Sequence, residues 1–219
     1  MIITIDGPAG SGKSTAARRL AQRLGVAYLD TGAMYRAITL RALRLGVDLT
    51  DRTALEQCAR QADLRMTFDG RDQRIWLDGQ DVTRDIRSAE VTDNSHYIAS
   101  TPGVRAVLVE MQQRVGRELG SLVTEGRDQG SVVFPDAQAK FFLDADVAVR
   151  ARRRFQEMQA DGSTVTYQEI HDAIAARDGR DRTRAVAPLT SPEGAVEIDT
   201  SNMTIEEVVD TLARTVEGL

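Results

Sequence analysis

The segment Gly7–Ser14, with the sequence GPAGSGKS, constrains this chain more than any other feature. It follows an apolar run, Ile2–Ile5, and precedes a helical pattern that begins at Thr15. A glycine-rich turn between a strand and a helix can direct its backbone N–H groups inward, and the positive end of the helix dipole points at the same place. This arrangement predicts a phosphate-binding loop, although an ordinary glycine-rich turn is the alternative interpretation.

Two side chains of the loop suit a bound triphosphate. Lys13 supplies a cation for the β- and γ-phosphates, and the Ser14 hydroxyl can ligate Mg²⁺. We therefore expect ATP to bind here together with Mg²⁺. The expected ATP contacts are Gly7, Pro8, Ala9, Gly10, Ser11, Gly12, Lys13, Ser14 and Thr15.

The composition argues against several other classes of protein. The 219 residues carry a formal net charge of −5, which disfavours a general binder of nucleic acid or of acidic membranes. One cysteine and two histidines allow neither an intrachain disulfide nor a zinc cluster of the usual spacing. No apolar stretch approaches the ~20 residues of a membrane span. We expect a soluble, cytoplasmic protein that is a monomer.

Hydrophobic periodicity alternates between strands and helices along most of the chain. Helices are expected between five buried strands, which span residues 2–5, 26–29, 121–125, 140–143 and 196–199. Such alternation predicts a parallel sheet with helices on both faces. Residues 63–84 instead show a period of two, with Asp-Gly turn signals at 69–70 and 78–79, which predicts a small antiparallel β insertion.

Polar residues indicate where several helices begin. Thr101, followed by Pro102, has the pattern of an N-cap with proline at the first helical position. The segments Thr166–Glu169 and Thr204–Glu207 each have the pattern of a capping box. We expect helices to begin at all three places.

Arg36 ends the segment Asp30–Arg36 (DTGAMYR), which follows the second expected strand. Ligands of open α/β sheets gather at the carboxyl ends of the strands. We expect Arg36 in the first turn of the next helix, where the helix dipole disfavours a cation unless an anion binds to it. A surface arginine without a ligand is the alternative interpretation.

The segment Glu125–Asp128 (EGRD) ends the third expected strand. Glu125 is well placed to hold a magnesium-bound water near Ser14, and Arg127 and Asp128 are expected to face the same crevice. An ion-paired turn is the alternative interpretation.

A cluster of arginines lies on the helix expected from near Asp146: Arg150, Arg152, Arg153 and Arg154. Only Glu157 and Asp161 follow closely enough to offset their charge, so an anionic ligand would relieve the repulsion. We expect a mobile lid over about residues 150–166, including the polar residues 162–163, that closes over nucleotide phosphates. A solvated helix face is the alternative interpretation.

Arg177–Arg184 (RDGRDRTR) alternates in sign. Beside a phosphate site it offers cations for phosphates and carboxylates for sugar hydroxyls, whereas alone it could be a salt-bridged surface segment.

Taken in order, these segments resemble the bacterial cytidylate kinases along nearly the whole chain. The residues that carry the resemblance are Ile3–Gly10, Asp30–Arg36, Gly126–Asp128, Gly130, Val132–Ala137, Arg180–Arg182 and Arg184–Pro188. The resemblance implies a P-loop NTPase-type α/β fold, with a five-stranded parallel sheet flanked by helices. It also implies an inserted monophosphate-binding region at residues 63–95, a core formed by 1–62 and 96–219, and a short lid at about 150–166.

The activity implied by the resemblance is transfer of the γ-phosphate of ATP to CMP or dCMP. The acceptor is a phosphate oxygen that is already an anion, so catalysis needs positioning and charge neutralisation rather than a general base. The resemblance places Arg150 and Arg154 at the ATP phosphates. The expected catalytic residues are Lys13, Arg127, Arg150 and Arg154.

Contacts to the phosphate and ribose of the acceptor are likewise implied by position. They are Thr31, Arg36 and Arg127 at the phosphate, Arg177 and Asp181 at the ribose, and Arg184 on the phosphate path. Arg105 and Asp128 resemble contacts to cytosine, whose 4-amino group donates to a carboxylate where uracil presents an acceptor. The family has a base-contacting serine where this chain has His96, which could donate or accept in its place.

Two other functions fit the phosphate loop. One is a P-loop kinase for another monophosphate, such as UMP, AMP or dTMP. The other is a nucleotide-dependent switch protein that binds ATP or GTP and signals by shape. The chain has no N/T-K-x-D sequence for reading guanine, and its clustered arginines suit a second phosphorylated ligand, which favours a kinase.

Overall fold

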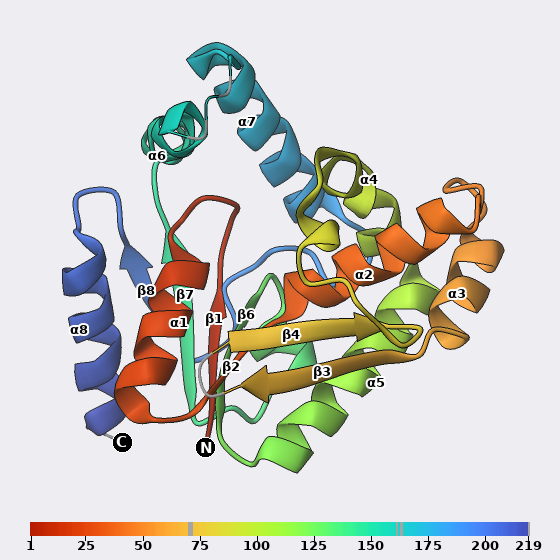
Figure 1. Cartoon of the computed structure of the whole chain (residues 1–219). Helices are drawn as coiled ribbons and strands as arrows, with labels where there is room; N and C mark the ends of the chain where they lie inside the picture. Colours follow the sequence, from red (N-terminus) through yellow and green to blue (C-terminus); the bar gives the residue numbers. More distant parts are fainter. Residues whose placement is uncertain (70–71, 161, 163, 219) are drawn as a thin grey trace. The chain divides into compact units, whose positions relative to one another are not determined.

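The computed structural model describes residues 1–69, 72–160, 162 and 164–218, and these form two compact units (Figure 1). Unit 1 combines residues 1–26 with residues 123–219. Unit 2 is the continuous stretch 27–122, and the insertion expected at 63–95 falls within it.

A five-stranded parallel sheet forms the core of the fold, as predicted. Its strands lie in the order β2 (Ala27–Asp30), β6 (Leu122–Gly126), β1 (Ile2–Asp6), β7 (Ala139–Asp144) and β8 (Val196–Asp199). In the register, Ile3 pairs with Ala139 and Phe141 pairs with Val196. β1 is buried along nearly its whole length, which explains its continuous apolar sequence. Because β1 is central, the loop after it lies at the carboxyl edge of the sheet, between the segments that follow β6 and β7.

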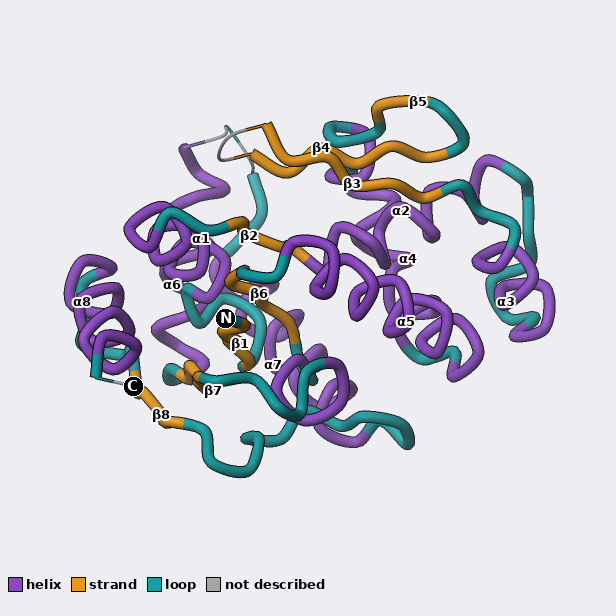
Figure 2. The backbone as a smooth tube through the Cα atoms, turned by 90° about the horizontal axis from the view of Figure 1, so that it is seen from below, coloured by secondary structure: helices purple, strands orange, loops and turns teal. Residues whose placement is uncertain are grey.

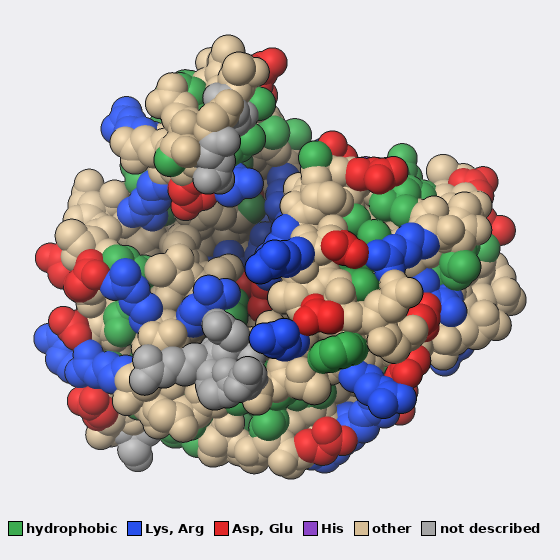
Figure 3. Space-filling view, in the orientation of Figure 1, with side chains coloured by type: hydrophobic (Ala, Val, Ile, Leu, Met, Phe, Trp, Pro, Cys, Tyr) green, Lys and Arg blue, Asp and Glu red, His purple; other side chains and the backbone are tan. Residues whose placement is uncertain are grey.

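Two amphipathic helices of unit 1 lie side by side, α1 (Lys13–Leu24) and α8 (Ile205–Glu217) (Figure 1). Their exposed faces are joined by two ion pairs, Arg19 with Glu206 and Arg23 with Asp210, the second at 2.6 Å. Basic and acidic side chains are accordingly interspersed over these two helices in Figure 3. Exposed pairs of this kind contribute little to stability, and the buried apolar faces hold the two helices in place.

The remaining helices of unit 1 are α6 (Val147–Ala160), α7 (Tyr167–Thr183) and a short π-helix, η2 (Gln129–Val133). α6 and α7 pack through a small apolar cluster that includes Ala151, Ile170 and Ile174. The capping boxes predicted at Thr166–Glu169 and Thr204–Glu207 are both confirmed, and they start α7 and α8.

Unit 2 contains the antiparallel insertion that the sequence predicts. The strands β3 (Leu64–Asp69), β4 (Asp72–Leu77) and β5 (Gln80–Asp81) form a three-stranded sheet in that order, and β3 and β4 run together as a ribbon in Figure 2. The predicted turn at 78–79 is confirmed, because Asp78 and Gly79 have positive φ angles of 48° and 80°. Gly70, in the other predicted turn, lies outside the described residues.

Helices complete unit 2 and bury its apolar cluster. They are α2 (Thr31–Arg44), α3 (Arg52–Arg60), the 3-10 turn η1 (Asp85–Arg87), α4 (Ala89–Ala99) and α5 (Pro102–Leu119). α2 lies at the centre of the cluster, with Met34, Ile38 and Ala42 buried. Nowhere in the described part of the chain is a helix both long and apolar enough to cross a membrane.

Thr101 is the N-cap residue of α5, as predicted, although its side chain forms no capping hydrogen bond. Pro102 does open α5, and Thr101 precedes it with an extended backbone. The Thr101 hydroxyl donates instead to the Tyr97 carbonyl oxygen, at 2.8 Å, because α4 ends only two residues earlier and its last carbonyls need donors.

Candidate active site

The loop between β1 and α1 has the backbone of a phosphate cradle. Gly12 stands before the first residue of α1 with a φ of 87°, which glycine adopts without strain. Gly7 has a φ of 144° and passes so close to β7 that a Cβ atom would lie 2.0 Å from the Leu143 carbonyl oxygen. Only glycine fits at this position, so the loop begins with its backbone against the neighbouring strand.

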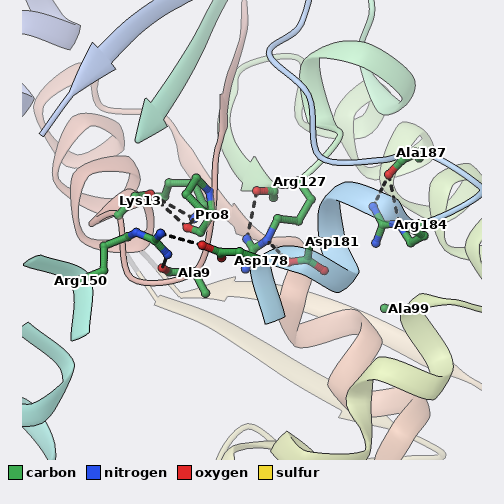
Figure 4. A network of polar contacts seen from close by, with 12 residues as sticks. Pro8, Ala9, Lys13, Ala99, Arg127, Arg150, Asp178, Asp181, Arg184 and Ala187 are labelled. Carbon is green, nitrogen blue, oxygen red and sulfur yellow. Dashed lines mark hydrogen bonds and ion pairs between the residues drawn. The ribbon is translucent and has the colours of Figure 1, made fainter. Parts of the chain in front are cut away.

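Lys13 lies within the loop and is 4% exposed. Its Nζ donates to the Pro8 carbonyl oxygen at 2.5 Å and lies 3.4 Å from Ser11 Oγ (Figure 4). Burial, together with the charges of Arg127 and Arg177, lowers the pKa of the Lys13 ammonium from 10.5 to about 7. Positive charge therefore gathers at one end of the sheet, as a site for a polyanion requires.

Ser14 and Glu125 meet as expected. The Ser14 hydroxyl donates to Glu125 Oε1 at 2.7 Å, and Glu125 is 7% exposed at the end of β6. Oxygen ligands in this number suit an Mg²⁺ ion that is shared with phosphate oxygens. Among the residues that the structure describes, no three His, Cys, Asp or Glu side chains gather as a metal site.

Arg127 and Asp181 are brought together by the fold. Arg127 Nε donates to Asp181 Oδ2 at 3.0 Å, so the segment after β6 contacts α7 (Figure 4). Both side chains are mostly buried, with 19% and 17% of their surface exposed. Asp128, the next residue, is 5% exposed, and Arg184 donates to the carbonyl oxygens of Val186 and Ala187.

Arg150 is more deeply engaged than a lid residue would be. Its NH2 group forms a 2.6 Å ion pair with Asp178, and its NH1 group donates to the Ala9 carbonyl oxygen of the phosphate loop at 2.9 Å (Figure 4). Arg150 is 3% exposed and Asp178 is 4% exposed. The expectation that only Glu157 and Asp161 offset the arginine cluster is therefore wrong, because α7 supplies a buried carboxylate.

The other arginines of α6 diverge rather than crowd together. Arg153 NH2 donates to the Thr200 carbonyl oxygen at 2.6 Å, while Arg154 pairs with Glu157 at 3.1 Å on the exposed side. A helix turns by about 100° per residue, so neighbouring arginines point in different directions. Repulsion among them is consequently no argument for an anion here. Asp161 and Ser163 of the expected lid lie outside the described residues.

In unit 2, Asp30 sets the start of α2. Its carboxylate accepts from Ala33 N at 3.0 Å and pairs with Arg87 at 2.5 Å, which caps the helix at Thr31. Arg36 is thus in the second turn, and the prediction that it occupies the first turn is wrong. The Arg36 guanidinium donates to Thr92 Oγ1 at 2.7 Å.

The predicted base contacts in unit 2 occupy different environments. Arg105 is 4% exposed, and its guanidinium lies over the Tyr35 ring at 5.7 Å from the centroid. His96 is exposed on α4, with Nδ1 2.7 Å from the Asp93 carbonyl oxygen. Since a carbonyl can only accept, this contact makes Nδ1 the protonated nitrogen and leaves Nε2 as an acceptor.

Two buried carboxylates near the loop were not among the predicted site residues. Asp178 could have been found from helical spacing, because it follows Ile170 and Ile174 on the buried face of α7. Asp6 ends a strand that is otherwise apolar, except for Thr4, and a carboxylate there needs partners that the sequence does not show.

A strand, a glycine-rich loop with a buried lysine and a helix define a P-loop NTPase-type fold. The sequence profile described as cytidylate kinase matches residues 3–218, and the chain belongs to the cytidylate kinase family. It is 47% identical over 208 residues to a cytidylate kinase of Caldanaerobacter subterraneus subsp. tengcongensis, covering 95% of this chain and 91% of that one. It is 49% identical over 215 residues to a cytidylate kinase of Desulforamulus reducens, covering 98% and 96%.

The fold is also similar to that of solved structures with little sequence identity. A shikimate kinase from Bacteroides thetaiotaomicron superposes with a TM-score of 0.51 at 15% identity, covering 99% of this chain and 98% of that one. This likeness concerns the fold alone.

Proposed function

We propose that this protein transfers the γ-phosphate of ATP to CMP or dCMP, giving CDP or dCDP. The observation that carries the proposal is the family match over residues 3–218, which leaves almost no part of the chain outside it. The phosphate loop with its buried lysine supports the ATP half of the reaction.

The donor side of the reaction depends on charge. Lys13 has a lowered pKa because its ammonium is buried and because Arg127 and Arg177 add positive charge nearby. A triphosphate would supply the missing negative charge, and the same cations would stabilise the charge that spreads over the transferred phosphoryl group. We propose Arg150 and Arg154 as further contacts to ATP, on the resemblance alone.

Ser14 and Glu125 are the residues that would hold Mg²⁺, directly and through water. Their 2.7 Å contact places a hydroxyl and a carboxylate where a nucleotide-bound ion needs oxygen ligands. When bound, the ion neutralises phosphate charge. The side chains of this pair orient one another before any ligand arrives.

The acceptor side needs no general base, because the attacking phosphate oxygen of CMP is already an anion and has no proton to lose. Arg127 and Asp181 form one ion pair within unit 1, and Asp128 follows Arg127 directly in the chain. This proximity supports the proposal that the three residues contact the phosphate, the ribose and the base of one acceptor nucleotide. We propose Arg177 and Arg184 as further contacts of this unit, and Thr31, Arg36, His96 and Arg105 as those of unit 2, on the resemblance to the family.

An activity panel tests the proposed function directly. ATP and Mg²⁺ are incubated with CMP, dCMP, UMP, AMP or dTMP, and the diphosphate products are separated by chromatography. We expect turnover to be fastest with CMP or dCMP. Faster turnover with another monophosphate would assign the chain a different acceptor, and ATP binding without acceptor-dependent turnover would favour a switch protein.

Location and assembly belong to the same proposal. The single cysteine, Cys58, fits a reducing compartment, so we propose a cytoplasmic protein. The apolar faces of α2 and α8 are buried within the chain's own units, which supports a monomer.

A further inference from the structure

The segment that presents Arg127 and Asp128 is anchored by a carboxylate from the strand that leads into the phosphate loop. Asp6 Oδ1 accepts from Gln129 N at 2.8 Å, and Asp6 Oδ2 accepts from Gly130 N at 2.8 Å. These are the first two N–H groups of η2, which have no partner within that helix. Both oxygens of one carboxylate therefore fix the peptide directly after Asp128.

Neighbouring contacts hold the same segment from its other sides. Gln129 is 1% exposed, and its Oε1 accepts from Thr124 Oγ1 at 2.9 Å. Gly130 passes so close to β1 that a Cβ atom would lie 2.8 Å from Thr4 Oγ1. We call the two Asp6 bonds and the Thr124–Gln129 bond the carboxylate clamp. Its parts are all buried, so water does not compete for its hydrogen bonds.

Asp6 is 0% exposed, and burial raises its pKa from 3.8 to about 6, while the two backbone N–H groups act in the opposite direction. Burying a carboxylate at the end of an apolar strand costs free energy, whereas an apolar residue would pack there without that cost. A π-helix is also rare and occurs mostly at functional sites. Both features suggest that the segment carrying Arg127 and Asp128 is held in a particular position for function, at some cost in stability.

We propose that Asp6, assisted by Thr124, is a positioning residue that holds Arg127 and Asp128 where the acceptor nucleotide binds. Asp6 does not itself touch a substrate. This inference rests on the proposed function, in which Arg127 contacts the acceptor phosphate and Asp128 contacts the base. It predicts that loosening the clamp weakens CMP binding while the phosphate loop, which begins at Gly7, still binds ATP.

The test compares Asp6→Asn with the wild type by steady-state kinetics, varying CMP and ATP separately. Asparagine keeps the size of the side chain, but its amide NH2 group replaces one of the two acceptor oxygens. One of the backbone N–H groups of Gln129 and Gly130 then loses its hydrogen bond and faces another donor. If the segment then holds its place in only about a tenth of the molecules, the apparent affinity for CMP falls about tenfold. We expect KM for CMP to rise at least about tenfold and KM for ATP to stay within about twofold.

A matched control is Asp51→Asn. Asp51 also accepts from two backbone N–H groups, those of Thr53 and Ala54, but it is exposed at the start of α3. We expect both KM values to be unchanged in this variant. A rise of both KM values by the same factor, or no rise of KM for CMP in Asp6→Asn, would overturn the positioning role.

If Asp6→Asn does not fold, Thr124→Val tests the positioning role of the clamp in its place. It removes the donor to Gln129 without placing a charge or a cavity in the sheet. A rise of KM confined to CMP supports the clamp, and unchanged constants overturn it. Wild-type protein without CMP-dependent turnover would instead refute the proposed function, and this inference with it.

Discussion

The lowered pKa of Lys13 predicts that the affinity for ATP falls as pH rises. In the protein alone, burial and the charges of Arg127 and Arg177 lower the pKa of its ammonium to about 7. A bound triphosphate would place several negative charges beside Nζ and restore the pKa toward its ordinary value. The complex should therefore bind a proton that the free protein lacks above pH 7, so binding takes up a proton and affinity falls as pH rises.

The size of the effect follows from the same pKa. At pH 8 about a tenth of the free protein carries the proton, so binding should take up about 0.9 proton. Between pH 7 and pH 9 the protonated fraction falls from about a half to about a hundredth, so affinity should fall about 50-fold. Asp6, with a pKa of about 6, is about nine-tenths ionised at pH 7 and almost completely ionised at pH 8, so it contributes almost no proton at the pH of the measurement.

Calorimetry measures the uptake directly. A non-hydrolysable ATP analogue with Mg²⁺ is titrated at pH 8 in HEPES and in Tris, whose different ionisation enthalpies reveal the number of protons exchanged. Lys13→Arg is the matched control, because a guanidinium stays charged and should abolish the uptake. Wild-type protein that takes up no proton, or an Lys13→Arg variant that takes up as many, would refute the assigned cause.

Three further predictions follow from the site. Asp128→Ala should narrow the preference for CMP over UMP by about 1–3 kcal/mol in kcat/KM, because alanine cannot accept from the 4-amino group of cytosine; an unchanged ratio would exclude that role. Asp178→Ala should lower the free energy of unfolding by about 3–5 kcal/mol in urea titrations, since Arg150 would stay buried without its partner; a loss below about 1 kcal/mol would show that Arg150 finds other partners. Gly7→Ala should lower kcat/KM for ATP at least about tenfold, because its Cβ would lie 2.0 Å from the Leu143 carbonyl oxygen; near-normal values would mean that the loop can shift without loss.

Local patterns predicted much of the fold because their causes are local. The capping boxes at Thr166–Glu169 and Thr204–Glu207 involve residues three apart, and the structure contains both. The period of two in residues 63–84 likewise predicted a small antiparallel insertion, which the structure shows as a three-stranded sheet. In each case the residues that decide the structure lie within a few positions of one another.

One error was local: Arg36 lies in the second turn of α2 because the Asp30 cap starts the helix at Thr31. The other features that the sequence did not reveal depend on distant residues. Arg150 is neutralised by Asp178, from the next helix, which the charge count along α6 could not reveal. The clamp joins Asp6 to Gln129 across more than half of the chain, so no local pattern indicates it.

The order of the strands also bears on how the chain folds during its synthesis. β1 leaves the ribosome first, yet its partner β7 begins only at Ala139. At a typical rate of protein synthesis the delay is on the order of ten seconds. Unit 2, continuous from 27 to 122, can bury its own apolar cluster in that interval. A nascent chain released before β7 emerges would carry the complete nucleotide-binding motif without the strand that supports its first glycine.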